Sequence, residues 1–153
     1  LFTKHDVFSS EEMHARYGIH LENYCKITAI EANTLLDMAQ RSILPVAARY
    51  SGDLAKGMAH KQEAQFSDLC RIEKYLIQEL GIQGGQLLDV CQSLSQALEN
   101  APAADSGIDA ARYYRSEIVT RTQKAGELIG QLESLVDAKA WPYPTYADIL
   151  FSV

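Results

Sequence analysis

Two pairs of acidic and histidine side chains have a spacing that could bind a metal ion. Glu11 and His14 form a Glu-x-x-His pair, and His60 and Glu63 stand in the reversed order. Di-iron helical bundles combine two Glu-x-x-His pairs with two further glutamates from facing helices. Only one pair here has the correct order, and it lies where we expect the first turns of a helix, at which the helix dipole favours carboxylates. We therefore interpret these side chains as solvated charges and keep a metal-binding bundle as the weakest hypothesis.

The three cysteines, Cys25, Cys70 and Cys91, show neither a C-x-x-C motif nor the spacing of a zinc site. Cys70 and Cys91 fall on apolar helical faces, so we expect reduced, buried thiols in a cytoplasmic protein. The Gly84-Gly85 pair is not a phosphate-binding loop, because no strand is expected before it and no Gly-Lys-Ser/Thr motif follows it. We therefore expect this chain to contain no catalytic residue, no cofactor site and no metal site.

The charge pattern argues against two classes of partner. The chain carries 14 basic and 20 acidic residues, a net charge of −6, and the basic residues form no dense cluster. Nucleic-acid binding and membrane-surface binding both need such a cluster, so we expect neither partner. No apolar run approaches the roughly 20 residues that cross a bilayer, and no leader sequence indicates secretion.

Helical signals cover most of the chain. Ser9 and Glu12 have the spacing of a capping box, which predicts a helix from about residue 10. No turn chemistry interrupts residues 11–42, so we expect one long helix or two nearly continuous ones. Pro45 predicts a kink or break near residues 43–44, because proline lacks the backbone donor.

The second half of the chain suggests a helical hairpin followed by one long helix. An amphipathic helix is predicted over 62–80, with Phe66, Leu69 and Cys70 on its apolar face and Glu73 as a polar exception. Gly81 is interpreted as its stop and residues 82–85 as a hinge to a helix over 86–100. A loop is predicted at 100–107 and a final long helix at 109–137. The predicted fold is all-α, a single domain of residues 1–153: a bundle of four to six helices, with long N- and C-terminal helices and a central hairpin.

Residues 141–153 contain the only Trp and two of the four Pro of the chain. A disordered tail would be polar and poor in aromatic residues, so this segment is predicted to dock, either on the helices of this chain or on a partner surface. We expect the Trp141 ring to be buried against the long helices. The candidate docking residues are Trp141, Pro142, Pro144, Tyr146 and Phe151.

The order of motifs resembles the C-terminal region of type III glutamine synthetases. The run Trp-Pro-Tyr-Pro-Thr-Tyr-Ala-Asp-Ile-Leu-Phe at 141–151 is similar to that family's Trp-Pro-x-Pro-Thr-Tyr-x-Asp-Leu-Leu-Phe ending. Residues 7–17 are similar to the start of the region, with departures at Met13 and Ala15 and, just beyond, at Gly18. The remaining similar segments are 21–24, 30–39, 43–46, 111–115 and 132–137. Residues 51–109 match only in helical character.

The resemblance implies a C-terminal accessory domain of an enzyme that joins ammonia to glutamate with ATP and Mg²⁺ or Mn²⁺. The catalytic residues of that family lie upstream, so none is carried onto this chain. Because the chain begins at Leu1, we expect it to be a fragment, inactive alone. Its implied partners are the catalytic region of the same enzyme and neighbouring subunits of a ring oligomer. The alternative is an independent helical binding module, an adaptor or regulator that grips a partner helix.

Overall fold

The computed structural model describes residues 9–144 and 146–151, and every regular element within them is helical. The all-α fold class is therefore confirmed. In chain order the elements are α1 (Ser10–Met38), the π-helical η2 (Ala39–Ile43), α2 (Leu44–Glu63), the 3-10 turn η3 (Ser67–Leu69), α3 (Arg71–Glu99), α4 (Ile108–Tyr113), the π-helical η4 (Tyr114–Val119), α5 (Thr120–Leu135) and α6 (Tyr146–Phe151).

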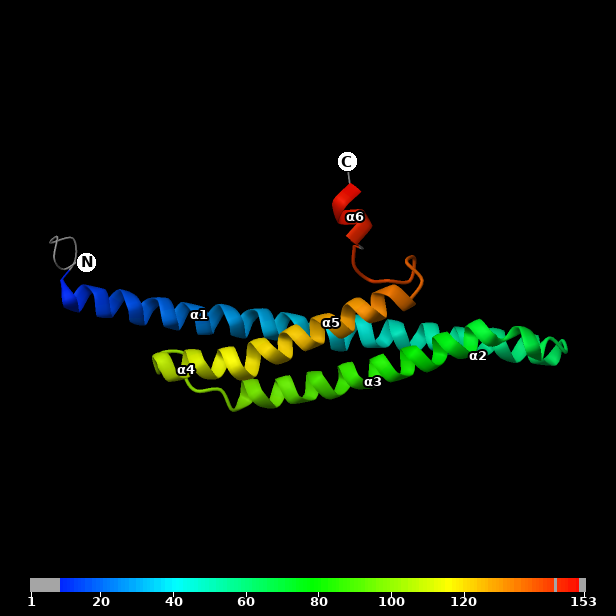
Figure 1. Ribbon diagram of the computed structural model, residues 1–153, viewed down its shortest axis with the longest axis horizontal. Helices are drawn as coiled ribbons and strands as arrows, with labels where there is room; N and C mark the ends of the chain where they lie inside the picture. The colour runs from blue at the N-terminus through cyan, green and yellow to red at the C-terminus, as the bar shows by residue number, and fades with distance from the viewer. Residues whose placement is uncertain (1–8, 145, 152–153) are drawn as a thin grey trace.

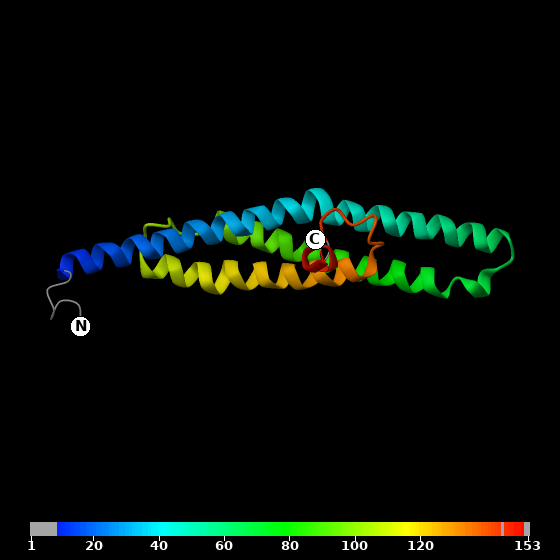
Figure 2. The same cartoon turned by 90° about the horizontal axis from the view of Figure 1, so that it is seen from above.

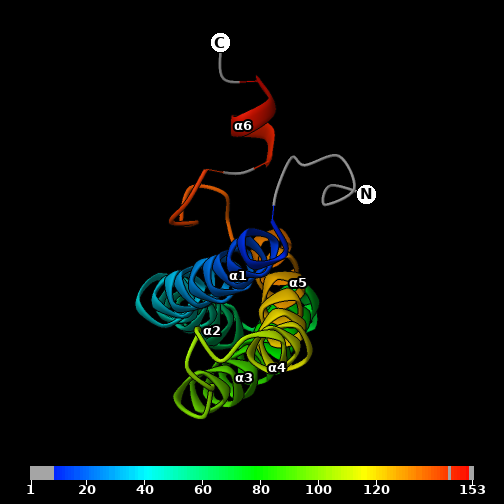
Figure 3. The same ribbon diagram turned by 90° about the vertical axis from the view of Figure 1, so that its left-hand side faces the viewer.

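The helices form an elongated bundle of three rods. Figures 1 and 2 show that α1 and α2 follow one another along the length of the molecule, and that α3 returns beside α2 in the opposite direction. The segment α4–η4–α5 then runs in the same direction as α1 and packs against both α1 and α3. Seen from one end, the three rods surround a common core (Figure 3).

The capping box at the start of α1 is present as the sequence predicts. The Ser9 backbone N–H donates to Glu12 Oε2 at 2.8 Å, and the Glu12 N–H donates to Ser9 Oγ at 3.1 Å. The hydrogen bond from the Ser9 backbone is the main reason that the pKa of Glu12 lies below its ordinary value. The box satisfies backbone donors that the first turn of a helix leaves without partners.

Pro45 produces a kink and not a break. The five residues of η2 adopt π-helical geometry, and Pro45 then occupies the first turn of α2. The wider π turn accommodates the missing backbone donor while the chain stays helical. The resulting bend between α1 and α2 is visible in Figure 2.

The predicted hairpin is in the wrong place. α3 continues through Gly81 and residues 82–85, so the predicted helices 62–80 and 86–100 are largely one helix, Arg71–Glu99. The chain reverses earlier, at residues 64–70, where Gln65 adopts a positive φ of 66°. A continuous buried stripe of Leu80, Leu87, Cys91 and Leu94 favours one helix. Burial of each such side chain contributes about 1.5–3 kcal/mol. This outweighs the cost of about 1 kcal/mol for each helical glycine.

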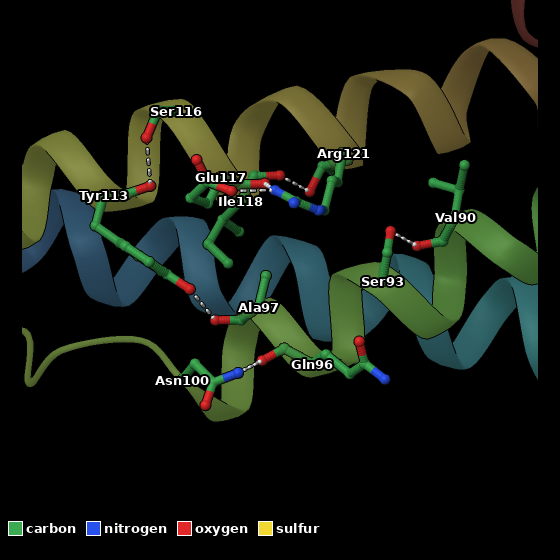
Figure 4. Close-up of polar contacts among 11 residues, drawn as sticks. Val90, Ser93, Gln96, Ala97, Asn100, Tyr113, Ser116, Glu117, Ile118 and Arg121 are labelled. Atoms are coloured by element: carbon green, nitrogen blue, oxygen red, sulfur yellow. Dashed lines mark hydrogen bonds and ion pairs between the residues drawn. The ribbon is translucent and has the colours of Figure 1, made fainter.

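The final long helix is close to its prediction, with α4, η4 and α5 continuous from Ile108 to Leu135. It begins after Gly107, whose φ of 73° and ψ of −140° suit glycine. The Tyr113 hydroxyl donates to the Ala97 carbonyl at 2.9 Å and so ties α4 to α3, as Figure 4 shows.

The core lies along the axis between the three rods. Its largest fully buried aliphatic side chains are Ile43, Leu87, Leu94, Ile118, Leu128 and Leu132. Cys25, Cys70 and Cys91 are also buried, as predicted, and each is a free thiol. Burial raises the pKa of the Cys25 and Cys91 thiols, which keeps them protonated and unreactive at neutral pH.

Candidate docking site

The acid–histidine pairs cannot form one metal site. His14 lies near the start of α1 and His60 near the end of α2, 46 positions further along one continuous helical rod. At a rise of 1.5 Å per residue, this separation is roughly 70 Å. His14 Nδ1 lies 2.7 Å from the Ser10 carbonyl oxygen. Within residues 9–144 and 146–151, no three His, Cys, Asp or Glu side chains are grouped so as to hold a metal ion. The hypothesis of a bundle that uses both pairs is therefore wrong.

The chain turns sharply after α5 and enters the tail. Val136 leaves the helix with an extended ψ of 145°. Asp137 then organises the turn: its carboxylate accepts from the Lys139 N–H at 2.9 Å, and its carbonyl accepts from the Ala140 and Trp141 N–H groups at 2.8 and 3.0 Å. These bonds fix the path of the chain up to Trp141.

Trp141 lies in the hydrophobic core of the bundle. It retains only 8% exposure and belongs to the same cluster of buried residues as Val46, Ala47 and Val136. Tyr143 packs partly buried against that cluster, whereas Pro142 and Pro144 are exposed. The root of the tail is therefore attached to the bundle through one large ring.

Beyond this ring the chain leaves the bundle. Figures 1 and 3 show α6 standing away from the three rods, with its axis pointing outward. Ile149 and Leu150 of this helix are 67% and 69% exposed. An isolated helix of six residues is far below the roughly 12–15 residues that give marginal stability in water, so α6 needs a surface to pack against. The side chains of Tyr146 and Phe151 lie outside the described residues, and their docking role stays a prediction.

A second exposed apolar surface lies at the tip of the α2–α3 hairpin, which the sequence analysis did not identify. Phe66 and Leu69, predicted on an apolar helical face, are 58% and 65% exposed, and Ile72 and Tyr75 are exposed beside them. We call these four residues the hairpin-tip cluster. Single exposed apolar side chains are common on protein surfaces, whereas four within ten residues make this turn a candidate interaction surface.

An ion pair joins the two helices on either side of this turn. The Lys61 ammonium on α2 donates to Glu73 Oε1 on α3. This hydrogen bond is the main cause that lowers the pKa of Glu73 and raises the pKa of Lys61. Glu73 Oε2 is buried without a hydrogen-bond partner among the described residues. Glu73, the polar exception on the predicted apolar face, thus pairs across the hairpin.

These features suit contact with other protein surfaces. The described helices include none with both the length and the apolar character required to traverse a bilayer. The arrangement joins a rigid rod to two apolar surfaces, α6 and the hairpin tip, at separate places along the rod.

Comparison with known proteins gives consistent matches. Residues 1–62 match the family model described as "Glutamine synthetase C-terminal domain". The whole chain is 29% identical to a glutamine synthetase of Butyrivibrio fibrisolvens and spans 22% of it. Over 95% of its length it is 23% identical to a glutamine synthetase of Bacteroides fragilis, of which it spans 21%. Over 99% of its length it is 24% identical to the type-3 glutamine synthetase of Dictyostelium discoideum, of which it also spans 21%.

The chain therefore spans about a fifth of the length of the curated relatives that it matches. No solved structure matches it. The alignment with the Butyrivibrio fibrisolvens protein covers the whole chain and so includes α3, α5 and the tail, which lie beyond the residues matched by the family model. Residues 1–62 are therefore similar to the glutamine synthetase C-terminal domain, and the chain as a whole is similar to part of three glutamine synthetases.

Proposed function

We propose that this chain is a single helical docking domain, residues 1–153, of a cytoplasmic glutamine synthetase. The observation that carries the proposal is α6, a short helix with exposed Ile149 and Leu150, held on a stem that Trp141 anchors in the core. A partner surface that buries these two side chains would stabilise α6 by about 3–6 kcal/mol, at 1.5–3 kcal/mol for each.

The two apolar surfaces face different parts of the enzyme in this proposal. α6 contacts the catalytic region of the same polypeptide, because the short stem keeps it close to the end of α5. The hairpin-tip cluster lies at the far end of the rod (Figure 1), where it can reach a neighbouring subunit of a ring oligomer. The rod of packed helices separates the two contacts.

Catalysis belongs to another part of the enzyme. Glutamine synthesis from glutamate, ammonia and ATP uses a divalent metal, Mg²⁺ or Mn²⁺. The described residues offer no group of metal ligands that fits such an ion. The isolated 153-residue chain, incubated with all four components, is expected to form no glutamine above the buffer control.

The docking role is tested in the complete glutamine synthetase that carries this domain. We expect the double variant Ile149→Asp/Leu150→Asp to reduce the assembled fraction in light scattering and to lower glutamine formation, because two carboxylates would enter an apolar contact. Ile82→Asp on α3 is the matched control, since Ile82 is also exposed, at 44%, but lies outside both proposed surfaces.

Normal assembly and activity of the double variant would contradict the proposal. The alternative of an independent adaptor or regulator predicts the opposite pattern: an active enzyme without this domain, and a separate protein that co-purifies with it. The alignments with three glutamine synthetases, which span 95–100% of this chain and about a fifth of each relative, favour the docking domain over this alternative.

A further inference from the structure

A polar hollow lies between α1 and the segment η4–α5. Its volume is about 440 Å³. Tyr24, Thr28 and Glu31 line it from α1, and Arg115, Thr120 and Gln123 line it from the facing rod. A smaller hollow of about 210 Å³ shares Thr28, Glu31 and Gln123 with it. Together they form one furrow whose size falls in the range of small-molecule sites, roughly 300–1,000 Å³.

The furrow brings together two opposite charges that do not neutralise one another. Glu31 and Arg115 both line it, and neither takes part in an ion pair with any described residue. Neighbouring charges have partners on their own helices: Arg121 binds Glu117 at 2.6 Å, as Figure 4 shows, and Lys26 binds Glu22 at 2.6 Å. The furrow therefore offers one free carboxylate and one free guanidinium to a ligand.

Thr28 supplies an unused hydroxyl at the same place. It is the buried polar residue of the described chain, with 7% exposure, and it lines both hollows. Thr34 and Thr122 donate their hydroxyls to carbonyls one helical turn back, at 2.8 and 2.9 Å. The Thr28 hydroxyl makes no such bond within the described part of the chain. The hydroxyl oxygen is not among the buried atoms that lack a partner, so it reaches the furrow and is open to a hydrogen bond from there.

The backbone of the facing rod is unusual here. Arg115 and Val119 belong to the π-helical segment η4, and Val119 also lines the furrow. Short π-helical segments inside α-helices occur frequently at functional sites, because the extra residue changes which side chains share a face. Arg115 of this π-helical segment and Glu31 of α1 line the same hollow.

We propose that this furrow binds a small α-amino acid. The carboxylate of the ligand accepts paired hydrogen bonds from the Arg115 guanidinium, and its ammonium group donates to Glu31. The Thr28 hydroxyl donates to the carboxylate from the floor of the furrow. The side chains of Thr120 and Gln123 can donate to and accept from a neutral polar ligand side chain, such as an amide. This site is independent of the docking function proposed above.

The test is a titration of the 153-residue chain with L-glutamine, followed by the backbone amide resonances in NMR spectra. We expect saturable shifts at Thr28, Val119 and Gln123. Two analogues test the charges without changing the protein: 4-carbamoylbutanoate lacks the ammonium group, and L-glutamine amide lacks the carboxylate. Each is expected to bind at least about tenfold more weakly, since each loses a charge-assisted hydrogen bond.

Variants test the same contacts from the protein side. Arg115→Met and Glu31→Gln are expected to weaken L-glutamine binding by at least about tenfold. Arg112→Met is the matched control, because Arg112 precedes the furrow by one turn and pairs with Asp109. It should bind as the unaltered chain does. Absence of saturable shifts up to the solubility of L-glutamine, shifts confined to another surface, or equal binding of both analogues would each overturn the proposal.

Discussion

Replacing Trp141 with alanine removes the ring that joins the tail to the core. A buried Trp side chain covers about 150–250 Å², which at about 25 cal/mol per Å² corresponds to roughly 4–6 kcal/mol. Trp141 is 8% exposed, so nearly all of this area is removed from water. Measured Trp-to-Ala substitutions in cores cost about 3–5 kcal/mol. We therefore expect Trp141→Ala to lower the free energy of unfolding by about 4 kcal/mol, a large fraction of the roughly 5–15 kcal/mol that holds a domain together.

Urea denaturation followed by circular dichroism measures this change, with Trp141→Phe as the control that keeps an aromatic ring. The single Trp of the chain gives a second, independent signal. Its emission should be blue-shifted in the native protein and should change at the same urea concentration as the helical signal. A loss below about 1 kcal/mol, or a Trp transition that precedes helix unfolding, would refute the view that the tail root belongs to the cooperative core.

Three further substitutions test the hairpin and the backbone. Gly84→Ala should raise stability by about 0.5–1 kcal/mol, because Gly84 lies inside α3 and an added Cβ meets nothing within 4 Å. Gly107→Ala should lower it by about 1–3 kcal/mol, because a φ of 73° strains a residue with a Cβ. Glu73→Gln should lower the urea midpoint at pH 7 through loss of the pair with Lys61. A carboxyl group with a lowered pKa stabilises the fold above its unfolded pKa of about 4.3. That contribution is lost as the pH falls through the folded pKa, so the two proteins should converge in acid.

A specific result would contradict each of these three predictions. A destabilising Gly84→Ala would favour the hinge predicted at residues 82–85 over a continuous α3. A neutral Gly107→Ala would show that the loop before α4 relaxes without strain. A difference between Glu73→Gln and the unaltered chain that stays constant from neutral to acidic pH would show that the charge of Glu73 contributes nothing at the hairpin.

Local chemistry predicted the helix boundaries that depend on neighbouring residues. The capping box of Ser9 and Glu12 needs only residues three positions apart, and the structure reproduces it. Pro45 changes its own turn, so the irregular geometry fell close to the predicted position. The last long helix was also bounded well, because Gly107 precedes it.

The predicted position of the hairpin was wrong because the position of the turn depends on tertiary packing. Glycines at 81, 84 and 85 are weak helix formers, but the stripe from Leu80 to Leu94 is buried between the other rods and keeps α3 intact. The true turn has no glycine or proline at its tightest point, and Gln65 adopts the positive φ in their place. Local propensity alone could not have located it.

For the candidate sites, too, the sequence predicted what depends on neighbouring residues and missed what depends on tertiary packing. The aromatic and proline content of the tail predicts a docking segment, and that role stays a prediction. It also predicts a buried Trp141, which the structure confirms, but not that Ile149 and Leu150 are exposed. The furrow with Glu31 and Arg115 was not predicted, since these residues lie far apart in the sequence and meet only after α1 packs against η4. In the sequence, Glu31 and Arg115 look like ordinary polar residues on solvated helix faces, so their positions do not indicate a shared site.

Amide hydrogen exchange of residues 148–150 tests the docking account most directly. In the isolated chain these amides belong to a six-residue helix with an exposed apolar face, and we expect rapid exchange. In the complete enzyme that we propose carries this domain, burial of Ile149 and Leu150 against a partner surface should slow their exchange by at least about a hundredfold, the equivalent of roughly 2.7 kcal/mol. Equally rapid exchange in both proteins would contradict the assignment of α6 as the docking element.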